Sequence, residues 1–189
     1  VRLLTIINAV LDFSRLEAGR FELERRPFSL RGMLSDVLRP MEPTARRKNL
    51  ELRTTVAPEV PATVGGDQNK LVPVLTNLVG NALHHGSADQ PVRICADGNL
   101  PETVSITDSN GGTIPPELMP HLFDAFRGGE REPGRHQGLG LGLFIAHQIG
   151  RAHRGAIEAK SQDNVTTFRV TWPRHAPARS AVAGRRWAT

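Results

Sequence analysis

The chain has 189 residues and 39% hydrophobic content, enough for one compact domain with an appendage, and no apolar run approaches the roughly 20 residues of a membrane span. Its one cysteine, Cys95, excludes an internal disulfide, and no signal peptide is visible, so we expect a cytoplasmic protein whose full-length form could be membrane-tethered. The net charge of +5 resides mainly in arginines of the chain ends and loops, without interleaved aromatic residues, so nucleic-acid binding is not expected.

The first half of the chain mixes helical and strand patterns. In order, we expect a helix over residues 1–19, a strand over 21–30, a helix over 31–49, a strand over 50–56 and a helix over 65–86. The first helix is amphipathic and ends at Gly19, Ser29 opens the second, and Asp67 lies near the start of the third.

The second half of the chain is expected to end in an antiparallel hairpin. We expect strands over 92–97 and 103–108, a short helix over 115–126, a loop over 127–137, a helix over 144–153 and strands over 155–161 and 166–173. The loop is rich in glycine and charge and has no periodic apolar positions. From Arg174 the chain is rich in Ala, Arg and Pro, which predicts a disordered tail.

The stretch GLGLGL, residues 138–143, directly precedes the helix predicted over 144–153. Backbone without Cβ atoms lets N–H groups approach an anion closely, and the positive end of the following helix adds attraction, so this stretch indicates bound phosphate. It is not a P-loop, which needs lysine and then serine or threonine after its last glycine. It is not a dinucleotide fingerprint either, because Leu143 stands where the third glycine belongs. A flexible hinge is the remaining alternative.

Two asparagines, Asn77 and Asn81, are four residues apart in the helix predicted over 65–86 and therefore lie on one face of it. Amides on a core helix are commonly buried structural groups with satisfied hydrogen bonds. An amide oxygen is also a hard neutral ligand that suits Mg²⁺ already carrying phosphate oxygens, and the glycines downstream favour this second interpretation.

Three further motifs lie in the order that a known family uses: DSNGGTIP at residues 108–115, LFDAF at 122–126 and TTF at 166–168. With the asparagines and GLGLGL, they resemble, over residues 1–173, the catalytic, ATP-binding domain of bacterial sensor histidine kinases, of the superfamily that includes gyrase and MutL. The resemblance implies an α/β fold of the Bergerat type, a two-layer sandwich with a mixed sheet under about three helices, preceded by an amphipathic helix. It also implies that the loop over 127–137 is a lid over the nucleotide.

The resemblance implies that the chain binds ATP and Mg²⁺, with Mg²⁺ coordinated by Asn81 and the phosphates and metal supported by Asn77. ATP-hydrolysing relatives carry a glutamate at the position of Asn77, and because an amide cannot accept the proton of an attacking water, transfer is favoured over hydrolysis. Thr167 would lie near the adenine, and Phe123 and Phe126 would either hold the base of the lid or be core residues. The implied cofactor-binding residues are Asn77, Asn81, His84, Asp108, Ser109, Gly111, Gly138, Leu139, Gly140, Leu141, Gly142 and Thr167.

Two of the motifs depart from the family pattern. Counting back from Ile114, the adenine-binding aspartate of the first glycine box falls on Ser109, and an aspartate stands one residue earlier, at Asp108. Either the turn is shifted so that Asp108 binds adenine, which we favour, or adenine recognition is weakened. The asparagine motif continues to His84, where lysine is usual, and a neutral imidazole attracts phosphate less than an ammonium does.

The phosphoacceptor histidine of the family lies in a box of the type H-E-x-x-x-P, and no such stretch occurs in the chain. We therefore expect residues 1–19 to end a dimerisation and phosphotransfer helix, 20–173 to form the catalytic domain and 174–189 to be a tail. The chain would be a histidine kinase fragment whose acceptor histidine is not on this chain but on a phosphoacceptor domain of the same or another kinase chain. A response regulator would be its partner, and the full-length protein would be a homodimer.

Two alternatives to this function differ in class. A degenerate module of the same family would act through protein interactions or regulation, with weak or no nucleotide binding; Ser109 and His84 favour it. A serine kinase of the anti-sigma type shares the motifs, but the helix containing LDFSRLEAG disfavours it.

Overall fold

A mixed five-stranded sheet forms the centre of the fold in the computed structural model, which describes Ser14 and residues 22–100, 102–126 and 140–175. In spatial order the strands are β2 (Leu52–Val56), β4 (Val92–Asp97), β5 (Thr103–Gly111), β7 (Val165–Pro173) and β6 (Ala156–Gln162). β2 and β4 are parallel, and the other neighbours are antiparallel. The hairpin predicted at the end of the chain is therefore confirmed as β6 and β7.

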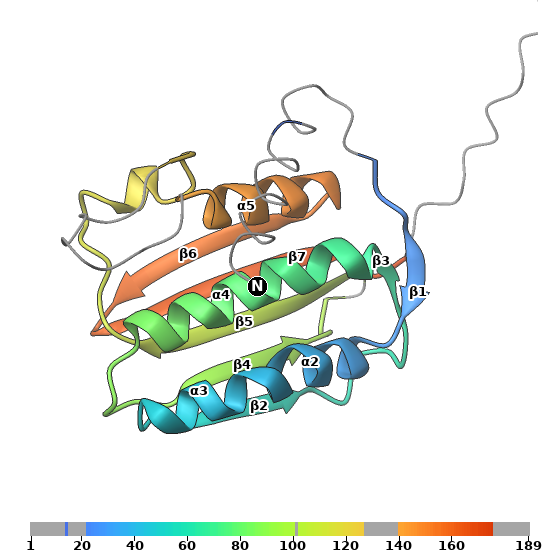
Figure 1. Ribbon diagram of the computed structural model, residues 1–189. Helices are drawn as coiled ribbons and strands as arrows, with labels where there is room; N and C mark the ends of the chain where they lie inside the picture. Colours follow the sequence, from blue (N-terminus) through green and yellow to red (C-terminus); the bar gives the residue numbers. More distant parts are fainter. Residues whose placement is uncertain (1–13, 15–21, 101, 127–139, 176–189) are drawn as a thin grey trace, which may run out of the picture.

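Helices cover one face of this sheet (Figure 1). They are α2 (Leu30–Leu38), α4 (Gln68–His85) and α5 (Gly142–Ala152), with the short α3 (Glu42–Arg47) and the 3-10 turns η1 (Arg39–Met41) and η2 (Met119–His121). α4 packs on β4 and β5, α5 packs on β6 and β7, and α2 packs beside α4. The predicted two-layer α/β sandwich with a mixed sheet under three main helices is confirmed.

The alternation of polar and apolar residues along the strands explains why one face is covered. In β4, Val92, Ile94 and Ala96 are buried, whereas Arg93 and Cys95 between them are exposed. Successive side chains of a strand point to opposite faces, so the apolar set packs under the helices and the polar set lies on an open face.

Prolines shorten two of the predicted helices. The helix expected over 31–49 is divided into α2, η1 and α3, with Pro40 in η1 and Pro43 in the first turn of α3. Proline has no N–H to donate and clashes with the preceding turn, so a continuous helix does not pass through this pair. The helix expected over 115–126 is reduced to η2 for the same reason, because prolines also punctuate this stretch.

A separate pair of short strands precedes α2 and α4. β1 (Arg26–Phe28) is the part of the predicted strand 21–30 that forms, and it pairs antiparallel with β3 (Val64–Gly66). β3 is absent from the sequence-based prediction, since three residues are too few to show a period. This pair brings the start of the domain next to the residue that begins α4.

Several predicted segments lie outside the described residues: most of the helix over 1–19, the loop over 127–137 and residues 176–189 of the tail. Arg174, where the predicted tail starts, is bonded to the fold: its N–H donates to the Glu102 carbonyl at 2.9 Å, and its own carbonyl accepts from the Gly65 N–H at 2.6 Å. In the described parts of the chain, no helix combines the length and the apolar composition needed to cross a membrane.

Candidate functional site

α4 presents a polar stripe of Asn77, Asn81 and His84. The helix begins after Asp67, whose side chain accepts a hydrogen bond from the Lys70 N–H, and its apolar side chains repeat at helical spacing. The buried members of this repeat are Leu71, Val74, Leu75, Leu78, Val79, Ala82 and Leu83. Because positions 77, 81 and 84 are spaced by four and three residues, their side chains adjoin along one face; the two asparagines are half-buried and His84 is exposed.

The start of α5 packs against this stripe at Gly142. A Cβ atom added to Gly142 would lie 2.3 Å from Nδ2 and 2.5 Å from Oδ1 of Asn77, so a side chain at this position would displace the Asn77 amide. Leu141, just before it, is 2% exposed and anchors the turn in the core. The structure thus brings the second glycine motif and the asparagine motif into contact at Gly142. Gly138 and Leu139 lie outside the described residues.

Asp108 lies on the helix-covered face of β5. It continues the buried alternation of Val104 and Ile106, is 2% exposed, and pairs across the sheet with Ile94 of β4 and Phe168 of β7. Neither of its carboxylate oxygens has a hydrogen-bond partner among the described residues. Burial disfavours the charged form and raises the pKa of Asp108 to about 8. The carboxyl group is flanked by apolar side chains, and no described residue donates to it.

Ser109 and Thr167 lie on the other face of the sheet. They are directly opposite each other in the β5–β7 ladder, and both are partly exposed, whereas Phe168 and Thr166 beside Thr167 are buried. The structure therefore does not bring Thr167 or Ser109 together with Asp108. The buried Thr166, to which the sequence analysis assigned no role within the TTF motif, donates to the Gly112 carbonyl at 2.9 Å. The same alternation of residues that buries Phe168 also predicts that Thr166 is buried.

The first glycine motif has one more residue between Asp108 and Ile114 than the family pattern has. The structure accommodates this residue after β5. The pairing of β5 with β7 continues without interruption as far as Gly111, which is buried. The next residue, Gly112, has φ of +120°, a left-handed conformation that favours glycine, and its N–H donates to the Asn164 carbonyl at 2.9 Å. Thr113, where the family pattern has its second glycine, is exposed. The left-handed residue is thus Gly112, one residue earlier than the second glycine that counting back from Ile114 places at position 113.

Lys48 reaches the C-terminal end of α4, where the sequence has His84 in place of the usual lysine. Its Nζ donates to the Leu83 carbonyl at 2.8 Å, so it contributes a cation to the negative end of the helix. The rings of His84 and His85 meet edge to face, with centroids 4.7 Å apart. Burial, then the charges of His84 and Lys48, lower the pKa of His85.

The LFDAF motif attaches to α5 through Phe123. Its ring stacks on that of His147, with centroids 4.9 Å apart and planes 20° from parallel, and burial lowers the pKa of His147. Phe123 is half-buried against the core, whereas Phe126 is 62% exposed. The two phenylalanines therefore differ in exposure: Phe123 packs against the core, whereas most of the Phe126 side chain is exposed.

Comparison with known proteins identifies the family. The family model described as histidine kinase-, DNA gyrase B-, and HSP90-like ATPase matches residues 66–176. The chain belongs to this family. The signal transduction histidine-protein kinase BarA of Escherichia coli K12 is 40% identical over 168 residues, which cover 86% of this chain and 18% of BarA. The chain therefore spans less than a fifth of the length of that relative.

Solved structures of histidine kinases share the fold. Full-length ShkA in complex with AMPPNP has a TM-score of 0.75 at 28% identity, over 95% of this chain and 38% of that chain. ThkA in complex with the response regulator protein TrrA has a TM-score of 0.71 at 25% identity, over 92% of this chain and 47% of that chain. With BarA, these similarities confirm the ATP-binding catalytic domain of a two-component sensor histidine kinase.

Proposed function

We propose that this domain binds Mg·ATP through α4, the start of α5 and β5, and that it transfers the γ-phosphate to a histidine outside residues 1–189. The observation that carries the binding step is the buried Asp108 carboxylate without a partner among the described residues. A buried acceptor that lacks a donor is costly, and the amino group of adenine would supply one. Ile94 and Phe168 beside it would contact the apolar faces of the base.

The amides of α4 fit the phosphate end of the same ligand. Asn81 would offer a neutral oxygen to Mg²⁺, and Asn77, held against Gly142, would support the phosphates. Gly140 and Leu141 lead into the N-terminus of α5, whose free N–H groups suit a phosphate. Mg²⁺ bound with ATP would neutralise the charge that develops on the transferred phosphoryl group.

Asn77 also favours transfer over hydrolysis, because its amide cannot act as a general base toward water. The phosphate would pass to the histidine of a phosphoacceptor domain, on the same or another kinase chain, and a response regulator would be the partner. The complex of ThkA with TrrA supports this partner class. The full-length protein would act as a homodimer, with this domain in the cytoplasm.

Calorimetric titration with Mg·ATP tests the proposal. Asn81→Ala is expected to cause a large loss of affinity. Asp108→Asn is expected to cause a loss of about ten- to a hundredfold at about pH 9, where the carboxylate is ionised, since a charge-assisted hydrogen bond contributes roughly 1.5 to 3 kcal/mol. Ser109→Ala is the matched control, because Ser109 neighbours Asp108 on the same strand but faces the open side. GTP, which presents a carbonyl in place of the amino group, should bind more weakly than ATP.

The result that refutes the proposal is an absence of binding by the wild-type chain at millimolar Mg·ATP. In that case the family's nucleotide chemistry is lost here, and the degenerate interaction module becomes the better account. If Asp108→Asn leaves the affinity unchanged and Ser109→Ala lowers it, ATP binding stands but Ser109 is the residue that recognises adenine.

A further inference from the structure

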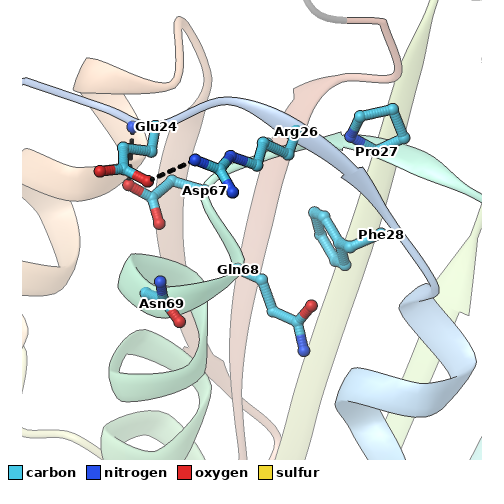
Figure 2. A pocket seen from close by; sticks show the side chains of 8 residues that line it. Glu24, Arg26, Pro27, Phe28, Asp67, Gln68 and Asn69 are labelled. Atoms are coloured by element: carbon cyan, nitrogen blue, oxygen red, sulfur yellow. Dashed lines mark hydrogen bonds and ion pairs between the residues drawn. The ribbon is translucent and has the colours of Figure 1, made fainter.

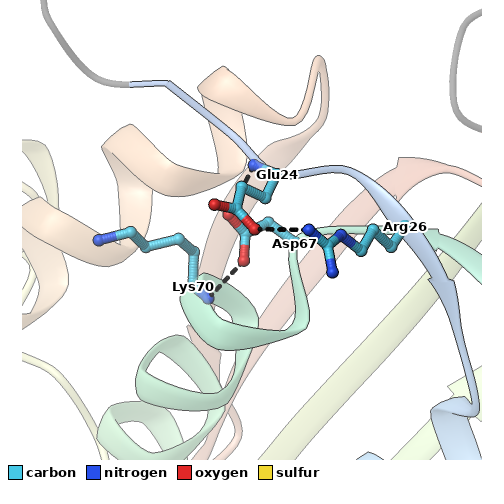
Figure 3. A network of polar contacts seen from close by, with 4 residues as sticks. All are labelled: Glu24, Arg26, Asp67 and Lys70. Carbon is cyan, nitrogen blue, oxygen red and sulfur yellow. Dashed lines mark hydrogen bonds and ion pairs between the residues drawn. The ribbon is translucent and has the colours of Figure 1, made fainter.

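Three segments far apart in sequence meet at the start of α4, and Asp67 is at their centre. Asp67 is buried, and its two carboxylate oxygens accept hydrogen bonds from different backbone N–H groups. Oδ1 accepts from Lys70 at 3.2 Å and so caps α4, whereas Oδ2 accepts from Glu24 at 2.9 Å (Figure 3). One carboxylate therefore binds both the first turn of α4 and the segment that enters β1.

The entering segment lies across the first turn of α4. Figure 2 shows a small pocket between them, lined by residues of 24–28 on one side and by residues 66–69 on the other. The side chains of Arg26 and Glu24 form an ion pair at 3.3 Å, but both are largely exposed, so this pair contributes little. The main-chain hydrogen bond to the buried Asp67 is the stronger attachment.

His153, the residue that ends α5, reaches the same place from the other helix. It is 1% exposed, its Nδ1 lies 2.8 Å from the Ile149 carbonyl oxygen, and its Nε2 lies 3.0 Å from the Asp67 backbone nitrogen. Because a carbonyl only accepts and an N–H only donates, these partners assign the hydrogen to Nδ1 and the lone pair to Nε2. A neutral imidazole thus joins the end of α5 to the start of α4.

Arg25 makes a second bond between the entering segment and α5. Its Nη2 donates to the Ala152 carbonyl at 2.7 Å, in the last turn of the helix. The last carbonyls of a helix have no intrahelical donor and carry partial negative charge, so a guanidinium is favourable there. Glu24 and Arg25 together therefore bond the entering segment to both helices.

We call the cluster of Glu24, Arg25, Asp67 and His153 the junction. The junction is one contact between α4 and α5, and the meeting of the two nucleotide motifs is the other. α4 contributes Asp67 to the first and Asn77 to the second, and α5 contributes His153 and Gly142. At 1.5 Å of rise per residue, the two contacts are separated by about 15 Å on either helix. Because the separations match, one relative placement of α4 and α5 forms both contacts.

We propose that Asp67 and His153 are positioning residues for the nucleotide site, which hold α4 against α5 so that Asn77 meets Gly142. Through Glu24 they also connect this pair of helices to the segment that leads in from the N-terminal residues. The inference rests on the proposed Mg·ATP site. Movement of the entering segment would reach that site through these bonds.

Side-chain replacements can separate this role from simple helix capping. Asp67→Asn keeps an effective N-cap oxygen but turns the other oxygen into an NH2 group, so one of the two N–H groups, that of Lys70 or of Glu24, would face a donor in place of an acceptor. His153→Gln is long enough to place an acceptor near the position of Nε2, whereas His153→Asn reaches only as far as Nδ1. Asn69→Ala, an exposed change in the same turn of α4, is the matched control.

In the full 189-residue chain, the Kd for Mg·ATP is expected to rise at least about fivefold in Asp67→Asn and His153→Asn. It should stay near the wild-type value in His153→Gln and Asn69→Ala. The side-chain amide resonances of Asn77 in NMR spectra are expected to shift in the same two affected variants, without nucleotide. A merely structural role would instead make Kd follow the urea midpoints, with His153→Gln impaired as much as His153→Asn.

Unchanged Kd and unchanged Asn77 resonances in folded Asp67→Asn and His153→Asn would overturn the positioning role, as would a Kd that follows stability across all variants. If the wild-type chain binds no Mg·ATP, the proposed function fails separately. The Asn77 resonances then decide this inference alone, because they report the contact of α4 with α5 whether or not nucleotide binds.

Discussion

Affinity for ATP should depend on pH through Asp108, because the ionised carboxylate is the form that accepts a hydrogen bond from an amino group without donating one. Burial raises the pKa of this group to about 8, and its oxygens have no partner among the described residues. With that pKa, about one carboxyl in ten is ionised at pH 7 and about one in a hundred at pH 6. Most molecules of the nucleotide-free domain then hold a neutral Asp108 near neutral pH.

The expected size of the effect follows from this population. When only a fraction of the protein is competent to bind, the apparent affinity is reduced by the same fraction. The affinity for Mg·ATP should therefore rise about ninefold from pH 6 to pH 7 and about fivefold from pH 7 to pH 8, and level off above about pH 9.

Titrations of wild type and Asp108→Asn at fixed free Mg²⁺ would measure this effect. The phosphates of ATP and the other protein groups titrate alike in both proteins, and an asparagine does not titrate, so the ratio of the two affinities isolates Asp108. The ratio should climb with pH and flatten above about pH 9. A constant ratio from pH 6 to pH 9 would refute the reasoning. A ratio that falls would mean that the neutral carboxyl pairs with adenine.

Without nucleotide, the stability of the domain should change with pH in the opposite direction to the affinity, because it should fall as the pH rises. The folded pKa of Asp108 lies above its ordinary value of 3.8, so the contribution of this group to stability is greatest below about pH 4 and falls as the pH rises toward 8. Asp108→Asn replaces the carboxyl with an amide that does not ionise, and so removes the cost of keeping this group protonated as the pH rises. Its melting temperature without nucleotide at about pH 7.5 should exceed that of wild type, by about 2–4 °C for each kcal/mol relieved.

Two further predictions use other parts of the structure. Gly142→Ala places a methyl group on the Asn77 amide and should weaken Mg·ATP binding, whereas Gly80→Ala, which meets nothing within 4 Å, should raise the urea midpoint and leave affinity unchanged. Burial, then the charge of Arg25, lowers the pKa of His153, so the unfolded chain binds a proton more readily and the free energy of unfolding should fall as the pH drops below about 6.5. Denaturant unfolding across that range should show a shallower fall in His153→Gln, and equal slopes would contradict this assignment.

The sequence predicts those parts of the fold in which the pattern of apolar and polar residues repeats several times. α4 repeats its apolar residues over five turns and begins at a capping aspartate, so its position is nearly correct in the prediction over 65–86. The predicted strands 92–97 and 103–108 fall within β4 and β5 for the same reason. The errors occur where a segment is too short to show a repeat, as in β3, or where prolines interrupt a helical pattern.

The placement of Asp108 was also available from the sequence. Counting along the family motif pointed to Ser109, but alternation along TVSITD puts Asp108 on the same face as Val104 and Ile106. The local period decides the face because the ladder with β7 has no bulge before Gly111. That Asp108 binds adenine stays a prediction, since the alternation of residues and the strand register give no information about a ligand.

The contacts of the junction could not be predicted, because each joins residues with no shared local pattern. His153 is 86 positions from Asp67 in the sequence, and Glu24 is 43 positions away. A histidine at the end of a helix is consistent with many roles, and the donor at Glu24 is a backbone N–H, which leaves no mark in the sequence at all. These bonds exist only once the sheet has placed α4 beside α5.

Asp67 and Asp108 show how differently one fold can treat the same side chain. Both are buried, at 4% and 2% exposed. Two backbone N–H groups reach Asp67, and no described residue donates to Asp108. An acceptor that the fold satisfies stabilises that fold whatever else is bound, whereas an acceptor that the fold leaves bare stabilises only a complex that brings a donor. The number of donors that reach each carboxylate therefore supports both proposals, that Asp67 holds the helices in place and that Asp108 recognises the ligand.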